Sequence, residues 1–217
     1  MDRQRRILAS AIVIALGWAW LRGAGPELSW ATIAAQAPPR AQAAAGLQKA
    51  VFASGCFWCT EADFDKVSGV VLTVSGYTGG RVANPSYEQV SRGGTGHAEA
   101  VEVTFDPTVV SYERLLDQYW HNVDPFVSNR QFCDVGDQYR PAIFVRDAAQ
   151  RAAAEASKAR MQTQFKDPIR VEIADAGPFY RAEDYHQDYY KKNPVRYRYY
   201  RWNCGRDQRL EEIWKKD

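Results

Sequence analysis

The stretch Gly55 to Cys59 places two cysteines three positions apart, with a phenylalanine and a tryptophan between them. It follows the apolar run 50–53 and precedes a stretch, 60–64, that carries two acidic side chains. We therefore expect a strand, a glycine turn and the first turn of a helix. Unpaired N–H groups and the positive end of the helix dipole favour an anionic sulfur at that position. Because the thiolate is the nucleophilic form of cysteine, the sequence predicts a reactive sulfur at Cys56.

The same motif has other readings. Cys56 and Cys59 have the spacing of a redox Cys-x-x-Cys pair, although a thioredoxin lacks the large Phe57-Trp58 pair between them. Those two aromatic rings can line an apolar pocket for a methyl or thioether group. A buried, unreactive Cys56 is one alternative. A zinc site is another, but no second pair of ligands with suitable spacing follows.

Glu99 lies at the start of an expected strand, among apolar neighbours in the stretch 96–101. A carboxyl group buried there has a raised pKa, stays protonated near neutral pH and can act as a general acid. Taken alone, a glutamate at a strand edge is more often solvated.

Four further polar residues lie in two long loops: Tyr77 and Tyr87 in the first, Asp134 and Tyr139 in the second. Phenol hydroxyls can donate hydrogen bonds to a polarised oxygen. Individually, each is as well explained by packing or by turn capping. Loops of this length inside a compact domain are usually functional.

The pattern of the body predicts an α+β fold, a two-layer sandwich of a mostly antiparallel sheet with helices on one face and a ferredoxin-like core. An irregular C-terminal arm is expected from Asn193-Pro194 onward. The expected strands are 50–53, 69–76, 97–105, 141–145 and 169–174, and the expected helical segments are 111–120, 147–164 and 184–190.

The first 45 residues differ in composition from the rest. Arg3, Arg5 and Arg6 precede the uncharged run 7–21, and an Ala/Pro-rich spacer follows. This is the pattern of an export signal, and 15 residues are short for a membrane-spanning helix. We expect a cleaved signal or a membrane anchor in residues 1–45, a catalytic domain in residues 46–217, and a periplasmic or secreted location.

Charge argues against a nucleic-acid partner. The formal net charge of +2 includes five arginines and two acidic residues before residue 46, and the remaining 23 basic and 24 acidic residues give −1. The basic and aromatic segment 191–206 is too short to change that expectation. The four cysteines are too few for a disulfide scaffold, but an oxidising compartment makes them candidates for pairing.

Several separate motifs resemble the A-type peptide-methionine sulfoxide reductases, and the resemblance covers about residues 49 to 204. The combination of the cysteine motif with Gly-His-Ala-Glu at this separation is highly specific. The motifs are Gly-Cys-Phe-Trp (55–58), Gly-Tyr-Thr-Gly-Gly (76–80), Asn-Pro-Ser-Tyr (84–87), Thr-Gly-His-Ala-Glu-Ala-Val (95–101), Asp-Gln-Tyr-Arg (137–140) and Tyr-His-Gln-Asp-Tyr (185–189).

The resemblance implies a role for each residue above. Cys56 is the expected nucleophile on the sulfoxide sulfur, and Glu99 is the expected acid at the sulfoxide oxygen. Tyr87 and Tyr139 are expected to hydrogen-bond that oxygen, and Asp134 to complete the polar side of the pocket. Phe57 and Trp58 are expected to hold the methyl group of the substrate.

The resemblance also implies the reaction. The S epimer of methionine sulfoxide, free or in proteins, becomes methionine while Cys56 becomes a sulfenic acid, and a second thiol condenses with that acid to a disulfide. A thioredoxin-like dithiol then resets the enzyme, with no metal or organic cofactor. We expect a monomer, with residues 7–21 as a possible tether.

The residue that supplies the second thiol is not determined by the resemblance, because the chain departs from the family pattern. Many relatives have glycine at position 59 and Gly-Asn at 132–133, and the tail lacks their Gly-rich cysteine run. Cys204 is the favoured resolving residue because it lies on an arm, followed by Cys59, whose i,i+3 pairing would be strained, and Cys133.

Two other functions remain. One is an exported thiol–disulfide oxidoreductase that uses Cys56 and Cys59, which would have no need of a protonated Glu99. The other is a membrane-tethered binding module without catalysis.

Overall fold

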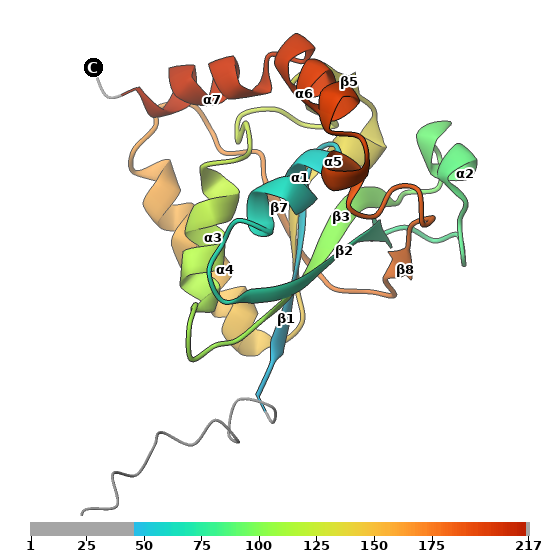
Figure 1. The fold of residues 1–217 in the computed structure, drawn as a ribbon. Coiled ribbons are helices and arrows are strands. Elements are labelled where there is room, and N and C mark those ends of the chain that lie inside the picture. The colour runs from blue at the N-terminus through green and yellow to red at the C-terminus, as the bar shows by residue number, and fades with distance from the viewer. Residues whose placement is uncertain (1–45, 216–217) are drawn as a thin grey trace, which may run out of the picture. The chain divides into compact units, whose positions relative to one another are not determined.

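The computed structural model describes residues 46–215, which form a six-stranded sheet with helices packed on it and a separate two-stranded sheet (Figure 1). The strands are β1 (Gln48–Ser54), β2 (Val70–Thr78), β3 (Ala98–Phe105), β4 (Arg130–Gln131), β5 (Asp134–Val135), β6 (Pro141–Val145), β7 (Glu172–Asp175) and β8 (Tyr180–Arg181). The helices are α1 (Phe57–Phe64), α2 (Tyr87–Ser91), α3 (Tyr112–Trp120), the 3-10 turn η2 (Asp137–Tyr139), α4 (Ala148–Gln162), α5 (Tyr189–Lys192), α6 (Pro194–Asn203) and α7 (Arg206–Trp214).

The large sheet has the strand order β7-β6-β1-β3-β2-β8 and is antiparallel except between β6 and β7. Its four central strands alternate with two helices along the chain as β1-α1-β2-β3-α3-β6, and α2 lies in the loop between β2 and β3. This is the split βαβ connectivity of a ferredoxin-like core. The predicted α+β sandwich with a mostly antiparallel sheet is confirmed.

The side chains of β1 explain where the core lies, because alternate residues of a strand face opposite sides of the sheet. Ala50 and Phe52 belong to the main core, which also contains residues of α1, α3 and α4. Val51 and Ala53 belong to a smaller cluster that is closed by the segment after β7. Helices α3 and α4 lie side by side on the main-core face (Figure 1). One face of the sheet therefore carries the helices, as predicted.

The C-terminal arm is helical and not irregular. Pro194 occupies the start of α6, where a missing N–H group costs nothing because the first N–H groups of a helix have no partner within it. The dipeptide Asn193-Pro194 thus begins a helix here. Helices α5, α6 and α7 cross the end of the sheet beside α1 (Figure 1). This placement brings the last cysteine, Cys204, to the region of the first.

Within residues 46–215, no helix combines the length and the apolar character needed to cross a bilayer. The expected signal or anchor in residues 1–45 lies outside the described residues.

Candidate active site

Cys56 sits at the junction that the sequence predicted, directly after β1 and at the N-cap of α1. Gly55 makes the turn with φ of +86°, and a Cβ atom there would lie 2.5 Å from Cβ of Gln131. Only glycine satisfies both the positive φ and the close approach. The Cys56 carbonyl accepts from the amides of Cys59 and Thr60, so the helix begins at once. The thiol is thereby fixed at the end of the sheet, with 6% of its residue surface exposed.

A cavity of about 210 Å³ opens at Cys56. Seven of the residues that line it were expected from the sequence, and the eighth, from α6, was not. They are Cys56, Phe57, Trp58, Tyr87, Glu99, Asp134 and Tyr139, together with Tyr200. The cavity therefore has an aromatic side, a thiol and two carboxyl groups.

Glu99 is 3% exposed on β3, and its Oε2 accepts a hydrogen bond of 3.1 Å from the backbone amide of Phe57. Burial raises the pKa of the Glu99 carboxyl to about 8, the amide of Phe57 opposes that rise, and the charge of Asp134 adds to it. A carboxyl group with this pKa is largely protonated at neutral pH and can donate a proton into the cavity. The buried carboxyl group fits the acid that the resemblance implies, and not the solvated glutamate that the strand position alone favours.

The two expected phenol groups reach the cavity from different elements. Tyr87 begins α2 and Tyr139 ends η2. Burial raises the pKa of Tyr87 to about 12, with Glu99 as the next cause, and it also raises the pKa of Tyr139. Both hydroxyls therefore stay protonated and can donate hydrogen bonds. Tyr77 does not line the cavity: it is fully buried and donates to Glu183 at 2.9 Å, which supports the packing reading of that residue.

Asp134 has a partner that sequence reasoning missed. The hydroxyl of Tyr200 donates to its Oδ2 at 2.5 Å. Burial raises the pKa of Asp134, while the Tyr200 hydrogen bond and the charge of Arg206 lower it. The only signal for Tyr200 was its place in the aromatic run of the tail, which gives no hint that α6 returns to the sheet end.

His186 supports the aromatic side of the cavity. Trp58 Nε1 donates to His186 Nδ1 at 3.0 Å, and the His186 ring lies 4.9 Å from the Phe57 ring and 4.5 Å from the Tyr87 ring between centroids. Burial lowers the pKa of the imidazole, which favours the neutral form that can accept. His186 belongs to the Tyr-His-Gln-Asp-Tyr motif, whose part in the site was not predicted from the sequence.

The two thiols at the start of α1 do not behave as the helix dipole alone predicts. Burial raises the pKa of the Cys56 thiol, and its hydrogen bond with Cys59 adds to that rise. The same hydrogen bond lowers the pKa of Cys59, against the opposing effect of burial and with help from Arg206 and Arg201. The prediction that the resting environment favours the Cys56 thiolate is therefore wrong. Loss of water around the sulfur outweighs the helix N-terminus.

Cys133 and Cys204 are joined in a disulfide, and Cys56 and Cys59 are free and buried. Cys133 is exposed in the turn between β4 and β5, and Cys204 is partly exposed at the C-cap of α6. The Sγ of Cys204 lies 4.0 Å from Oδ2 of Asp134, which lines the cavity. The three candidates for the second thiol thus lie near Cys56: Cys59 on the same helix, and Cys204 with its disulfide partner Cys133 beside Asp134.

Metal binding is not favoured at the one cluster of suitable ligands among residues 46–215. Its members are Cys133, Asp134 and Cys204, whose ligand atoms lie within 4.8 Å of one another. Both sulfurs are bonded to each other, so only the carboxylate remains as a strong ligand.

The chain is similar in sequence to a known protein family. Residues 48–217 match the family described as Peptide methionine sulfoxide reductase. Peptide methionine sulfoxide reductase MsrA of Bacillus licheniformis is 52% identical over 167 residues, which cover 76% of this chain and 92% of that protein. Peptide methionine sulfoxide reductase MsrA/MsrB of Vibrio cholerae is 51% identical over 175 residues, and the match spans 80% of this chain but only 46% of that longer protein.

Solved structures agree with the sequence comparison. Mxr1 from Saccharomyces cerevisiae in reduced form has a TM-score of 0.67 at 33% identity, covering 69% of this chain and 87% of that one. Methionine sulfoxide reductase A of Corynebacterium diphtheriae has a TM-score of 0.62 at 34% identity, covering 69% of this chain and 76% of that one.

Proposed function

This chain belongs to the peptide methionine sulfoxide reductase family, and from that premise we propose that it reduces the S epimer of methionine sulfoxide, free or in oxidised proteins, to methionine. Its role is then the repair of oxidised proteins. The observation that carries the proposal is the presence of Cys56 and a protonated Glu99 on one 210 Å³ cavity with an aromatic side.

The first step needs both of these groups. A sulfoxide is a poor electrophile until its S–O bond is polarised, so Glu99 donates a proton toward the oxygen while the sulfur of Cys56 attacks the sulfoxide sulfur. The proton that the Cys56 thiol loses as it attacks replaces the one that Glu99 donated, so the carboxyl group ends the step protonated. Oxygen passes to Cys56, which becomes a sulfenic acid, and methionine leaves. The cysteine is oxidised as the sulfoxide is reduced, so no external reductant enters this step.

The remaining residues of the cavity bind and orient the substrate. Tyr87 and Tyr139 donate hydrogen bonds to the sulfoxide oxygen, and Asp134 completes the polar side. Phe57 and Trp58 hold the methyl group against their rings. Support comes from their common cavity and from the protonated state of both phenols.

In the second step, the thiol of Cys204 condenses with the sulfenic acid of Cys56, which forms a Cys56–Cys204 disulfide and releases water. The thiol of Cys133 then attacks the sulfur of Cys204, so Cys56 leaves as a thiol and a Cys133–Cys204 disulfide remains. A thioredoxin-like dithiol reduces that disulfide. A disulfide between exposed Cys133 and partly exposed Cys204, beside a free Cys56, matches the end of this series of steps.

The thiol–disulfide oxidoreductase alternative has less support. Cys56 is 6% exposed and Cys59 is 1% exposed, which gives a protein disulfide little access to either sulfur. A buried carboxyl group with a pKa of about 8 beside the thiol also has no function in disulfide exchange.

We further propose that the protein acts as a monomer outside the cytoplasm, either released or tethered through residues 7–21. The basic start and the uncharged run that follows support export. Mass spectrometry of the mature N-terminus from fractionated cells tests the export, and a cytoplasmic chain that retains residue 1 would contradict it.

Turnover of the separate S and R epimers of methionine sulfoxide with dithiothreitol tests the activity. We expect methionine from the S epimer only, and none from Cys56→Ser. No methionine from the wild-type chain, or full activity in Cys56→Ser, would exclude this function.

A further inference from the structure

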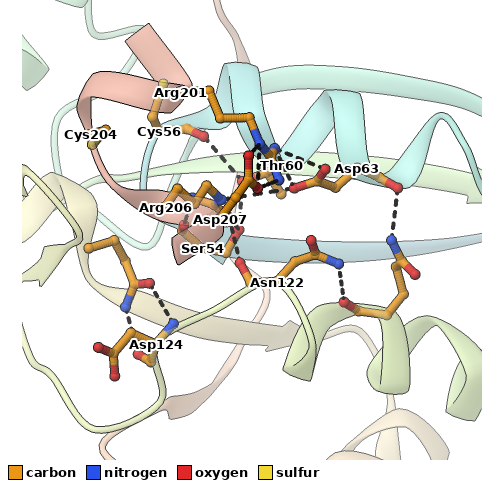
Figure 2. A network of polar contacts seen from close by, with 12 residues as sticks. Ser54, Cys56, Thr60, Asp63, Asn122, Asp124, Arg201, Cys204, Arg206 and Asp207 are labelled. Carbon is orange, nitrogen blue, oxygen red and sulfur yellow. Dashed lines mark hydrogen bonds and ion pairs between the residues drawn. The ribbon is translucent and has the colours of Figure 1, made fainter. Parts of the chain in front are cut away.

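Arg206 is the largest charged side chain that is fully buried in residues 46–215, and the reaction above does not use it. It is the first residue of α7, two positions after Cys204, and it is 2% exposed. Gly205, with φ of +67°, forms the corner between α6 and α7. The guanidinium of Arg206 is the centre of the polar network in Figure 2, which also draws Cys56 and Cys204. A buried arginine of this kind needs partners that satisfy its charge and its donors.

The first set of partners lies at the end of β1. Arg206 Nη1 donates to the backbone oxygen of Ser54 at 3.1 Å, and Nη2 lies 3.3 Å from Ser54 Oγ. Nη2 also donates to the backbone oxygen of Asn122 at 2.5 Å. Ser54 stands two residues before Cys56, so the guanidinium is bonded directly to the strand end that fixes the nucleophile.

The second partner is Asp63 on α1. Its carboxylate accepts two hydrogen bonds of 3.0 Å from Nη1 of Arg201 and lies 3.9 Å from Nε of Arg206. These two arginines stand on either side of Cys204, one on α6 and one on α7. The corner that carries Cys204 is therefore anchored from both sides to the helix that Cys56 caps.

The third partner is Phe132. The Cζ atom of Arg206 lies 4.5 Å from the centre of the Phe132 ring, within the range of a cation–π contact. Phe132 directly precedes Cys133 and has φ of 52°, an uncommon conformation for a residue other than glycine. One guanidinium thus contacts or adjoins the three segments that carry Cys56, Cys204 and Cys133.

We propose that Arg206 is a positioning residue for the disulfide-forming step, which it promotes by holding the Cys204 corner and the Cys133 turn at the strand end beside Cys56. The inference rests on the proposed function, because it needs a Cys56 sulfenic acid that condenses with the Cys204 thiol and releases water. Arg206 does not line the cavity, so it does not touch the sulfoxide. Its planar guanidinium donates hydrogen bonds to Ser54 and Asn122 at the same time, and a lysine ammonium cannot reproduce that geometry.

The experiment separates the two steps in the full, reduced and desalted chain. One equivalent of the S epimer is added without reductant. Methionine formation is followed by chromatography, and disulfide formation by mass spectrometry of quenched samples, with dimedone as a trap for sulfenic acid. The variants are Arg206→Met and Arg206→Lys, and Arg198→Met is the matched control, since Arg198 is an exposed arginine of α6.

We expect methionine formation to slow much less than disulfide formation in every variant, because Arg206 lies outside the cavity and reaches Cys56 only through the strand end at Ser54. Disulfide formation should slow by about tenfold or more in Arg206→Met, less in Arg206→Lys and not at all in Arg198→Met. The amount of Cys56 sulfenic acid trapped by dimedone should rise in each variant as its disulfide formation slows. If thermal melting shows that Arg206→Met does not fold, Arg206→Lys decides the question.

Disulfide formation at the wild-type rate in Arg206→Lys and in any folded Arg206→Met would overturn the inference, as would a parallel slowing of both steps. Methionine formation in the wild-type chain shows that the proposed function holds even where the inference about Arg206 fails. A wild-type chain that forms no methionine would overturn the proposed function, and the inference with it.

Discussion

The backbone amide of Phe57 donates a 3.1 Å hydrogen bond to Oε2 of Glu99, which joins the first residue of α1 to the third strand of the chain. Phe57 directly follows Cys56, so this bond sets the buried carboxyl group beside the nucleophilic sulfur. It is also the one contact that lowers the pKa of Glu99, against burial and the charge of Asp134. The bond therefore both places the acid and limits how far its pKa rises.

Glu99→Gln should slow methionine formation by about 10²- to 10⁴-fold, the usual contribution of a general acid. Glutamine keeps an acceptor for the Phe57 amide, so the geometry is retained and only the proton is lost. Single-turnover methionine formation is the measurement. Glu102→Gln is the control, because Glu102 lies on the same strand but pairs with Lys49 and Arg146 away from the cavity. Equal rates in the two variants would remove Glu99 from the role of acid.

The buried carboxyl group should also make stability depend on pH. The pKa of Glu99 is about 8 in the fold against an ordinary value of 4.5, so between these values the folded chain binds more protons than the unfolded chain. Its contribution to the free energy of unfolding is complete below pH 4.5 and is lost as the pH rises to about 8. Relative to Glu99→Gln, the wild type should lose on the order of 4 kcal/mol over that range.

Urea unfolding of both proteins at about pH 5, 7 and 9 measures this difference. Other titrating groups are common to the two proteins and cancel in the comparison. A difference that does not change with pH would show that the carboxyl group is not held protonated in the fold.

Patterns local in sequence predicted much of this site. The position of Cys56 follows from a strand, a glycine and a helix start, and the turn at Gly55 has the positive φ that such a junction requires. The strand pattern around Glu99 left a solvated carboxyl group as the favoured interpretation, and the resemblance to a known family was needed to make it the expected acid. The main strands and the caps of the helices at Ser111 and Asp147 were equally readable, because their signals lie within a few neighbouring residues.

Contacts between segments far apart in the chain could not be predicted from the sequence. Tyr200 reaches Asp134 across 66 positions, and Arg206 reaches Ser54 across 152. The tail was expected to be an arm that brings Cys204 to the site, but not to form α6, since Asn193-Pro194 is compatible with a loop or with a helix start. The pairing of Cys133 with Cys204 was open for the same reason. The pKa of Cys56 depends on burial by these distant segments, which a local motif does not contain.

The order of the cysteines can be tested by single substitutions. Wild-type chain given one equivalent of S epimer and no reductant should form one equivalent of methionine and end with a Cys133–Cys204 disulfide. Cys204→Ser and Cys133→Ser should still form one equivalent of methionine, but lose turnover with a protein dithiol, while Cys59→Ser keeps turnover within about threefold. Methionine yield and disulfide mapping are the measurements. Lost turnover in Cys59→Ser together with normal turnover in Cys204→Ser would assign the second step to Cys59.

Gly55→Ala should be strongly destabilising. An alanine there takes a positive φ and places its Cβ 2.5 Å from Cβ of Gln131, so the turn or the Gln131 backbone must shift. The cost should be about 2 kcal/mol or more, with a loss of methionine formation because Cys56 moves. Gly94→Ala is the control, with φ of +79° but no atom within 4 Å of its Cβ position, and should cost only about 1 kcal/mol. Equal denaturation midpoints for the two variants would contradict a role for the Gln131 contact.

His186→Phe should weaken substrate binding through Trp58. A phenyl ring keeps the contacts with Phe57 and Tyr87 but offers no acceptor, so the Trp58 N–H group, now 3.0 Å from Nδ1, is left partly buried without its partner. The free energy of unfolding should fall by about 1–3 kcal/mol, and the KM for methionine sulfoxide should rise severalfold as the aromatic side loosens. His186→Asn restores an acceptor close to the place of Nδ1 and should recover KM, although it removes the ring. If KM follows the ring instead, so that the phenylalanine variant binds normally and the asparagine variant does not, packing and not the hydrogen bond holds Trp58 in place.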